Sequence, residues 1–366
     1  MLGGLVSAST KALGGSRFSL LNILPATVVV TTVAVLVRAG AYSPDGQVRF
    51  DHVLPEGKRD ALAIALFGLA ALLCGILLRP FETALVQLLE GYWANPSPLA
   101  PLVPAAVERH RRRRDDAKTV AESGHSVPPP RTDATLQELA RHDRRASRAV
   151  RRKLRAESVR DAYPNDDRLA DEPVEAETHP TDVMPTLLGN VLRRGERVAG
   201  DRYGLDMMVV YPRLYPYISD RLEGAVGRQF ELITSTASLS ISFGLLSLAT
   251  TPLLARLDPW SAAPFLAAAL SVLAYRGAVA ASRGHARLLA TVFDLHRFDL
   301  AAAMHYELPK TPREEYQLNK DITDFLGPGS VAPLRDHETL HDKQFKHPVS
   351  GPDTSQRTDR HRTADS

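Results

Sequence analysis

The segment from residue 285 to residue 305 contains side chains that could do acid–base or metal chemistry. They are His285, Asp294, His296, Asp299 and His305. Imidazoles and carboxylates act as general acids and bases and as metal ligands. His296 and Asp299 are close enough in sequence to share one face of a helix, whereas His285 and His305 lie about three turns away in opposite directions. The spacing favours the polar face of an amphipathic helix, and an enzyme that uses His296 and Asp299 is the alternative.

A second dense stretch of polar residues and glycines runs from Pro185 to Pro216. It contains Gly-Asn, Tyr-Gly-Leu-Asp and Tyr-Pro-Arg-Leu-Tyr-Pro. Pro185 suits the start of a helix and Gly200 suits its end, while Asp220 followed by Glu223 is typical of a capping box. These signals favour a structural joint ahead of a long helix. The alternative is a surface for a ligand or partner, and its candidate residues are Tyr203, Asp206 and Arg213.

The common catalytic signatures are absent from the sequence. It has no Gly-rich phosphate loop, no Gly-x-Ser-x-Gly elbow and no His-Glu-x-x-His pair. Cys74 is the only cysteine, which rules out an intrachain disulfide and a cysteine-based metal cluster. We therefore expect no catalytic residue, no cofactor and no metal ion, and the sequence favours a function other than catalysis.

Long apolar runs determine the expected fold class. They are Leu20–Val37, Ala61–Leu78, Leu232–Ala255 and about Trp260–Ala281, the last interrupted only by Arg276. Each approaches or exceeds the roughly 20 residues that a helix needs to cross a bilayer. The sequence thus predicts an all-α membrane protein with four transmembrane spans in two hairpins. A cleaved signal peptide is the alternative for the first run, because Ala39-Gly40-Ala41 resembles a cleavage site.

The expected organisation follows from these runs and from the polar sequence between them. It comprises a cytoplasmic N-terminal tail (1–19), hairpin 1 (20–78), a cytoplasmic helical module (79–231), hairpin 2 (232–281), a cytoplasmic helical extension (282–327) and a disordered tail (328–366). Two hairpins place both termini and the module on the same side of the membrane. Basic sequence in the module favours the cytoplasmic side of the inner (plasma) membrane of the cell.

Residues 109–160 form a basic block, with sixteen basic and seven acidic residues. Such a block is compatible with a solvated helix face or with anionic lipid headgroups, which attract basic residues near a membrane. Nucleic acid is disfavoured, since no aromatic residues are interleaved with the arginines. An acidic loop (164–184) follows the block and could pair with it. Hydroxyl residues in the third run favour close helix packing over the lining of a pore.

Two short motifs resemble those of a group of bacterial multi-pass membrane proteins common in actinobacteria. The first extends from P-T-x-L-G-N-V-L-R, beginning at Pro185, through R-Y-G-L-D to the P-R-L-Y-P that ends at Pro216. The second, F-D-L-x-R-F, begins at Phe293. The resemblance covers the layout of residues 18–326 and departs at Tyr211, where the group would have Trp. It implies the four-span layout and brings no known activity, cofactor or catalytic residue.

We expect a non-enzymatic membrane protein that binds a partner or organises a complex. The expected partners are membrane lipids, including anionic headgroups at the basic block, an unidentified protein, and further copies of the chain. An oligomeric channel or transporter is one alternative, based on the hydroxyl-rich third run. A membrane enzyme of unfamiliar class is the other.

Overall fold

The computed structural model describes residues 24–43, 48–49, 68–69, 73, 77, 81–93, 97–123, 144–164 and 183–327, and every regular element among them is a helix. The predicted all-α class is confirmed for these residues. The chain divides into two compact units, Met1–Gly195 with Gly224–Leu288 and Glu196–Glu223 with Leu289–Ser366. The predictions for the N-terminal tail, most of the second apolar run, nearly all of the acidic loop and the tail 328–366 fall outside the described residues.

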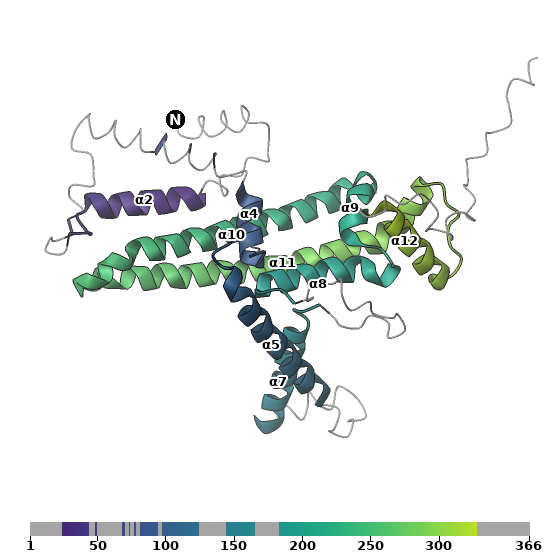
Figure 1. Cartoon of the computed structure of the whole chain (residues 1–366), viewed down its shortest axis with the longest axis horizontal. Coiled ribbons are helices and arrows are strands. Elements are labelled where there is room, and N and C mark those ends of the chain that lie inside the picture. The colour runs from purple at the N-terminus through teal and green to yellow at the C-terminus, as the bar shows by residue number, and fades with distance from the viewer. Residues whose placement is uncertain are drawn as a thin grey trace, which may run out of the picture. The chain divides into compact units, whose positions relative to one another are not determined.

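The predicted third and fourth spans form the helices α10 (Asp220–Thr250) and α11 (Ala263–Ala303), joined by the short helices η7 (Thr251–Arg256) and η8 (Pro259–Ala262) (Figure 1). Both are long and apolar enough to cross a membrane. Their apolar stretches are only 33% and 28% buried inside the protein, and Leu248 and Leu273 are 71% and 66% exposed. A soluble core helix would bury most of these side chains, so within the part of the chain that the structure describes much of this apolar surface is uncovered.

Small and hydroxyl side chains hold α10 and α11 together. Ser240 and Ser271 each donate a hydroxyl hydrogen bond to the other's backbone carbonyl, at 3.1 and 2.7 Å. The Ser247 hydroxyl donates to the Pro264 carbonyl at 2.9 Å. Hydroxyls that bond across two helices satisfy their own polarity and allow the backbones to approach closely. These contacts agree with the packing role expected from the third run.

The C-terminal end of α2 (Leu24–Arg38), the described part of the first apolar run, lies at the turn between α10 and α11. Leu36 and Ala41 form a buried cluster with Leu253. The Arg256 guanidinium donates to the carbonyls of Ala41 and Ser43 at 3.1 and 2.6 Å. The turn of hairpin 2 and the chain after α2 are therefore found together at one end of the α10–α11 pair.

Helix α4 (Glu82–Glu90) lies toward the other end of the same pair. Its Val86 packs into a buried cluster with Ile233, Ala237 and Ala281. Ile233 and Leu253 are twenty residues apart, which corresponds to about 30 Å of helix. The segments before and after the second apolar run thus contact η7 and α10 at sites that are separated by about the thickness of a hydrocarbon core.

Residues Pro185–Asn190 join α4 to α8 (Leu187–Gly200) through close polar contacts. The Thr186 hydroxyl donates to the Glu90 carbonyl at 2.8 Å. A Cβ atom at Gly189 would lie 2.1 Å from the same carbonyl, so only glycine fits there. Asn190 is fully buried and bonds the backbone of Met184 and Thr186 at 2.6–2.9 Å. The Pro-Thr-x-Leu-Gly-Asn motif is a structural joint.

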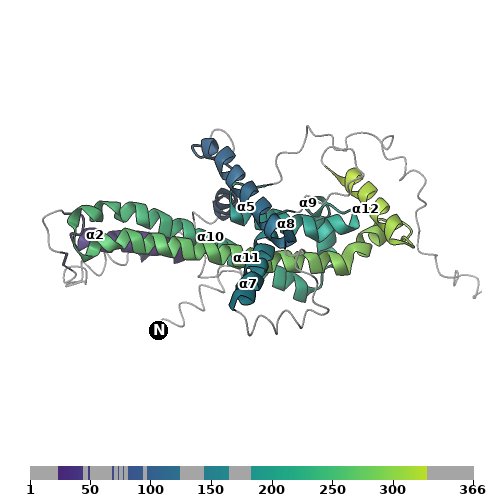
Figure 2. The ribbon, with the colours of Figure 1, turned by 90° about the horizontal axis from the view of Figure 1, so that it is seen from below.

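The basic block forms an antiparallel pair, α5 (Val103–Ser123) and α7 (Arg144–Arg160), which we call the basic hairpin. At its foot, Val107 and Tyr163 share a buried cluster with Leu188 of α8 and with Ala278 and Val279 of α11. In both views α5 and α7 run across the direction of α10 and α11 (Figures 1 and 2). Ala278 and Val279, placed inside the predicted hairpin 2, therefore pack against protein.

The second unit is built around α9 (Met207–Leu214), α12 (Pro312–Leu326) and the short helices η5 (Asp201–Tyr203) and η6 (Tyr215–Tyr217), with the C-terminal part of α11. α12 packs against η5 and α9. Residues 207–214 form a helix, although it contains Pro212. One sequence prediction is corrected here: in place of the capping-box contact expected from Asp220 and Glu223, the Glu223 carboxylate accepts a hydrogen bond from the Tyr215 hydroxyl.

The close approach at Gly189 leads to a stability prediction. Gly189→Ala should lower the free energy of unfolding by about 1–3 kcal/mol or more, because the new methyl group overlaps a backbone carbonyl. Gly227→Ala, in α10 with no atom within 4 Å of the added Cβ, should leave stability unchanged or raise it by up to about 1 kcal/mol. Thermal unfolding of the two detergent-solubilised variants, followed by circular dichroism, measures both effects. Equal melting temperatures would contradict the joint.

Candidate functional site

The two motifs that stood out in the sequence meet in the second unit. The Tyr203 hydroxyl donates to the Asp294 carboxylate at 2.6 Å. The Arg297 guanidinium lies 4.7 Å from the centre of the Tyr203 ring and forms a 2.7 Å ion pair with Glu315. Arg202 adds a 3.5 Å ion pair to Asp294. Cation–π contact and charge pairing in one place make a compact polar cluster, which we call the Tyr203 cluster.

The protonation of Tyr203 is fixed by this environment. Partial burial raises the pKa of the Tyr203 phenol above its ordinary value, and the hydrogen bond to the Asp294 carboxylate raises it further. A phenol held in its neutral form near a carboxylate is a hydrogen-bond donor and not a base. The Tyr203 cluster therefore has the chemistry of a structural lock between residues 201–206 and α11.

The turn after Tyr203 is locked onto α12 as well. Gly204 has a φ of 76°, and a Cβ there would lie 2.5 Å from the Tyr316 carbonyl. The Asn319 side-chain amide donates to the Tyr203 carbonyl at 2.9 Å, and the Thr323 hydroxyl to the Gly204 carbonyl at 3.3 Å. The sequence did not identify these α12 partners, because nothing in the spacing of Asn319 and Thr323 points to a turn more than a hundred residues earlier.

The three predicted surface residues have different environments. The Asp206 carboxylate caps α9 by accepting from the Met208 and Val209 amides at 2.7 and 3.3 Å. Tyr203 and Asp206 thus lie in one turn, both held by interactions inside the unit. The Arg213 guanidinium donates to the Val209 carbonyl of its own helix and is exposed. Arg213 makes no hydrogen bond or ion pair with Tyr203 or Asp206, so no direct contact links it to the other two residues.

The imidazole and carboxylate residues are only partly brought together. His296 and Asp299 pair at 2.7 Å, as their spacing predicts. The His285 ring packs beside Phe230, with the ring centres 6.0 Å apart, and His305 has a φ of 61° just after α11 ends. Among the described residues, no group of three or more His, Cys, Asp or Glu side chains could hold a metal ion.

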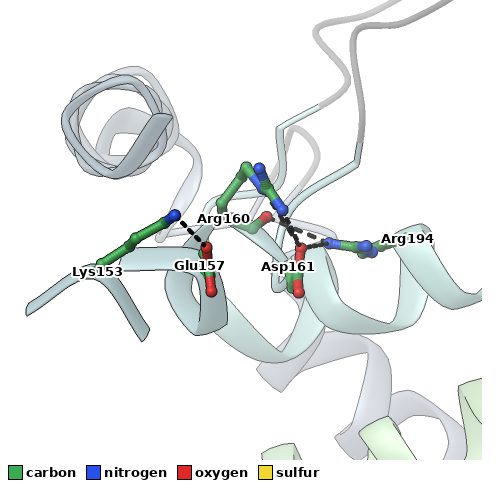
Figure 3. Close-up of polar contacts among 5 residues, drawn as sticks. All are labelled: Lys153, Glu157, Arg160, Asp161 and Arg194. Carbon is green, nitrogen blue, oxygen red and sulfur yellow. Dashed lines mark hydrogen bonds and ion pairs between the residues drawn. The ribbon is translucent and has the colours of Figure 1, made fainter. Parts of the chain in front are cut away.

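The foot of the basic hairpin contains a second polar cluster (Figure 3). Asp161 accepts from Arg160 at the end of α7 and from Arg194 of α8, each at 3.4 Å, and Arg194 also donates to the Arg160 carbonyl. One turn earlier, Lys153 pairs with Glu157 at 3.9 Å. These contacts attach the C-terminal end of α7 to α8 and pair Lys153, Arg160 and Arg194 with acidic side chains.

A histidine inside the basic hairpin is also accounted for. His110 Nδ1 lies 2.9 Å from the hydroxyl of Tyr163, which is fully buried. Burial lowers the pKa of His110, and the neighbouring charges of Arg113 and Arg109 lower it further. Burial likewise raises the pKa of the Tyr163 phenol. The pair is therefore neutral near pH 7 and adds no charge to the hairpin.

The outer surface of the basic hairpin carries arginines that no acidic group neutralises. Arg151, Arg152 and Arg155 are exposed on α7, and within the described chain they have no ion-pair partner. Along α5, a surface groove of about 480 Å³ is lined by Ala105, Glu108, Arg109, Arg112, Arg113 and Asp116. α7 has eight basic residues and only one acidic residue, Glu157. This surface attracts anions.

No family model, curated protein or solved structure matches the chain. The resemblance of its motifs to a group of multi-pass membrane proteins therefore stays a prediction. The site assignments rest on the contacts described above.

The capping contact gives a test of whether Asp206 is structural. Asp206→Ala should destabilise the protein by about 1 kcal/mol through loss of the helix cap, and Asp206→Ser should retain most of the stability. Arg213→Ala should change stability by less than about 0.5 kcal/mol, since exposed substitutions rarely do more. Chemical denaturation of the three variants separates these outcomes. An Asp206→Ala protein as stable as the parent would show that the carboxylate is not needed for the fold.

Proposed function

We propose that the chain is a multi-pass membrane protein with two transmembrane hairpins that binds a protein partner through its second unit. The observation that supports membrane insertion is the exposure of the apolar stretches of α10 and α11. Exposure of large aliphatic surfaces to water is unfavourable, whereas contact with hydrocarbon is not. The backbone hydrogen bonds of a helix are satisfied within the helix, so it can lie in lipid.

The proposed first hairpin is supported by the residues on either side of the second apolar run. Ala41, before the run, clusters with Leu253 at the turn end, and Val86, after it, clusters with Ile233 and Ala237. Between Ala41 and Val86 the chain must therefore travel about 30 Å along the α10–α11 pair. A transmembrane span at Ala61–Leu78 would cover this distance, and the loops of both hairpins would then lie on the same side of the membrane.

The basic hairpin supports a cytoplasmic assignment for the opposite side. It carries fourteen basic and five acidic residues in α5 and α7, whereas at the turn Arg256 is paired with Asp258 at 2.8 Å. Positive charge close to the ends of spans is retained on the cytoplasmic side. Both termini of the chain are then cytoplasmic, and the membrane is the inner (plasma) membrane.

The partner surface that we propose is the exposed side of α9 and η6. Val210 and Leu214 face the interior of the second unit, which leaves Met208, Arg213, Tyr215 and Tyr217 exposed. Methionine, tyrosine and arginine are the residue types enriched at protein–protein interfaces. Arg213 favours a partner protein that offers an acidic residue among apolar contacts. Of the three predicted surface residues, Arg213 alone remains in this role.

Site-specific photo-crosslinking in native membranes tests this function. A photoreactive amino acid at Met208 or at Tyr217 should give one recurrent adduct of the same mass, because both positions face the same partner. Leu308, a comparably exposed residue of the same unit, serves as the control position and should give none. Arg213→Glu should reduce the adduct at least about tenfold, since reversing one interface charge costs more than 1.4 kcal/mol.

Three results would contradict the proposal. The first is the absence of any adduct at Met208 and Tyr217. The second is an equal yield from Leu308, which would indicate random collision. The third is an adduct made of two copies of this chain, which would show that the surface joins copies of the protein and not a separate partner.

A further inference from the structure

The foot of the basic hairpin is fixed at a defined level along α11. Val107 and Tyr163 share a buried cluster with Ala278 and Val279, and the Leu188 amide donates to the Tyr275 hydroxyl at 3.1 Å. Eighteen residues separate Trp260 at the turn from Ala278, which corresponds to about 27 Å of helix. A hydrocarbon core is about 30 Å thick. If the turn lies at one membrane surface, the foot of the hairpin lies at the other.

The direction of the hairpin keeps its charges near that surface. α5 and α7 cross the α10–α11 direction in both views (Figures 1 and 2). Helices that cross a transmembrane pair at its end extend along the membrane plane and not away from it. The polybasic helices would therefore stay within reach of headgroups over much of their length, where the attraction between Arg and anionic lipid is strongest.

The distribution of ion pairs identifies which residues are available. Lys153, Arg160 and Arg194 are engaged with Glu157 and Asp161 at the foot (Figure 3). Arg151, Arg152 and Arg155 point to no acidic group in the described chain and are exposed. Guanidinium groups bind phosphate oxygens with two parallel hydrogen bonds, which an ammonium group cannot do.

We propose that the basic hairpin binds the phosphates of anionic lipid headgroups in the leaflet beside it, with Arg151, Arg152 and Arg155 as the principal contacts. This inference rests on the proposed membrane insertion. Nucleic acid is the rival anion. It is disfavoured because α5 and α7 contain no Phe, Tyr or Trp, and Tyr163 at their foot is fully buried and offers no surface for base stacking.

The test uses the full chain reconstituted in phosphatidylcholine bilayers. Ser158, exposed on α7 between the arginines and the foot, is replaced by cysteine and labelled with a fluorescent dye, in a Cys74→Ser background. Phosphatidylglycerol or phosphatidylcholine carrying a nitroxide near the headgroup then quenches the dye. Phosphatidylglycerol should quench at a much lower mole fraction, and raising the salt concentration from about 0.1 M to about 1 M should reduce the difference.

Matched charge variants identify the contacts. R151Q/R152Q should lower the apparent association constant of phosphatidylglycerol roughly thirty-fold. Each arginine near the surface contributes about 1 kcal/mol of binding free energy, and about 1.4 kcal/mol corresponds to a tenfold change in the constant. K310Q/R313Q removes two exposed charges from the second unit and should change it less than about twofold. Far-UV circular dichroism of each variant checks that α7 remains helical.

The outcomes separate the two proposals. Extraction of the protein from membranes by alkaline carbonate would overturn membrane insertion itself. If the protein stays in the membrane but the two lipids quench the dye equally, only the lipid inference is overturned. The same holds if R151Q/R152Q and K310Q/R313Q lower the association constant for phosphatidylglycerol equally. Equal quenching by the two lipids before and after nuclease treatment, together with co-purifying nucleic acid that R151Q/R152Q removes, would overturn it in favour of nucleic acid.

Discussion

The apolar stretches of α10 and α11 have to be kept from water, and the described part of the protein buries only about a third of their residues or fewer. Exposing apolar surface to water costs about 25 cal/mol of free energy per Å². Exposed side chains such as Leu248 and Leu273 are therefore unfavourable unless another molecule covers them. The hydroxyls on the same helices point the other way, into bonds between Ser240 and Ser271. Apolar side chains on the outer surface and hydroxyl groups at the interface between the helices are typical of a helix pair packed in hydrocarbon.

The polar motifs make sense once this pair is taken as the frame. Gly189 and Asn190 bring α8 against the end of α4, and Arg194 holds the end of α7 on α8. In the second unit, Tyr203 and Gly204 bind α11 and α12. Asp294, one of the residues that resemble catalytic groups in the sequence, is thus used to join Tyr203 to α11. We propose that other molecules bind at the arginines of α7 and at the exposed side of α9.

The sequence predicted the features that depend on local or periodic signals. Uncharged runs are long enough to specify α10 and α11, Gly200 ends α8 as expected, and the three-residue spacing of His296 and Asp299 produced their contact. It could not predict α9, since Pro212 argues against a helix when considered locally and the cap by Asp206 with burial of Val210 and Leu214 outweighs it. Nor could it predict that Asn319 and Thr323 would hold the turn at Tyr203, because contacts between distant segments leave no periodic trace.

The central claim is that lipid covers the exposed apolar faces of α10 and α11. A spin label at position 248, in full-length protein reconstituted in bilayers, tests it directly through collisions with oxygen, which concentrates in hydrocarbon, and with a nickel complex, which stays in water. The account predicts frequent collisions with oxygen and few with nickel at position 248, and the reverse at position 158 on α7. Nickel access at position 248 equal to that at position 158 would place this helix pair in water and contradict the account.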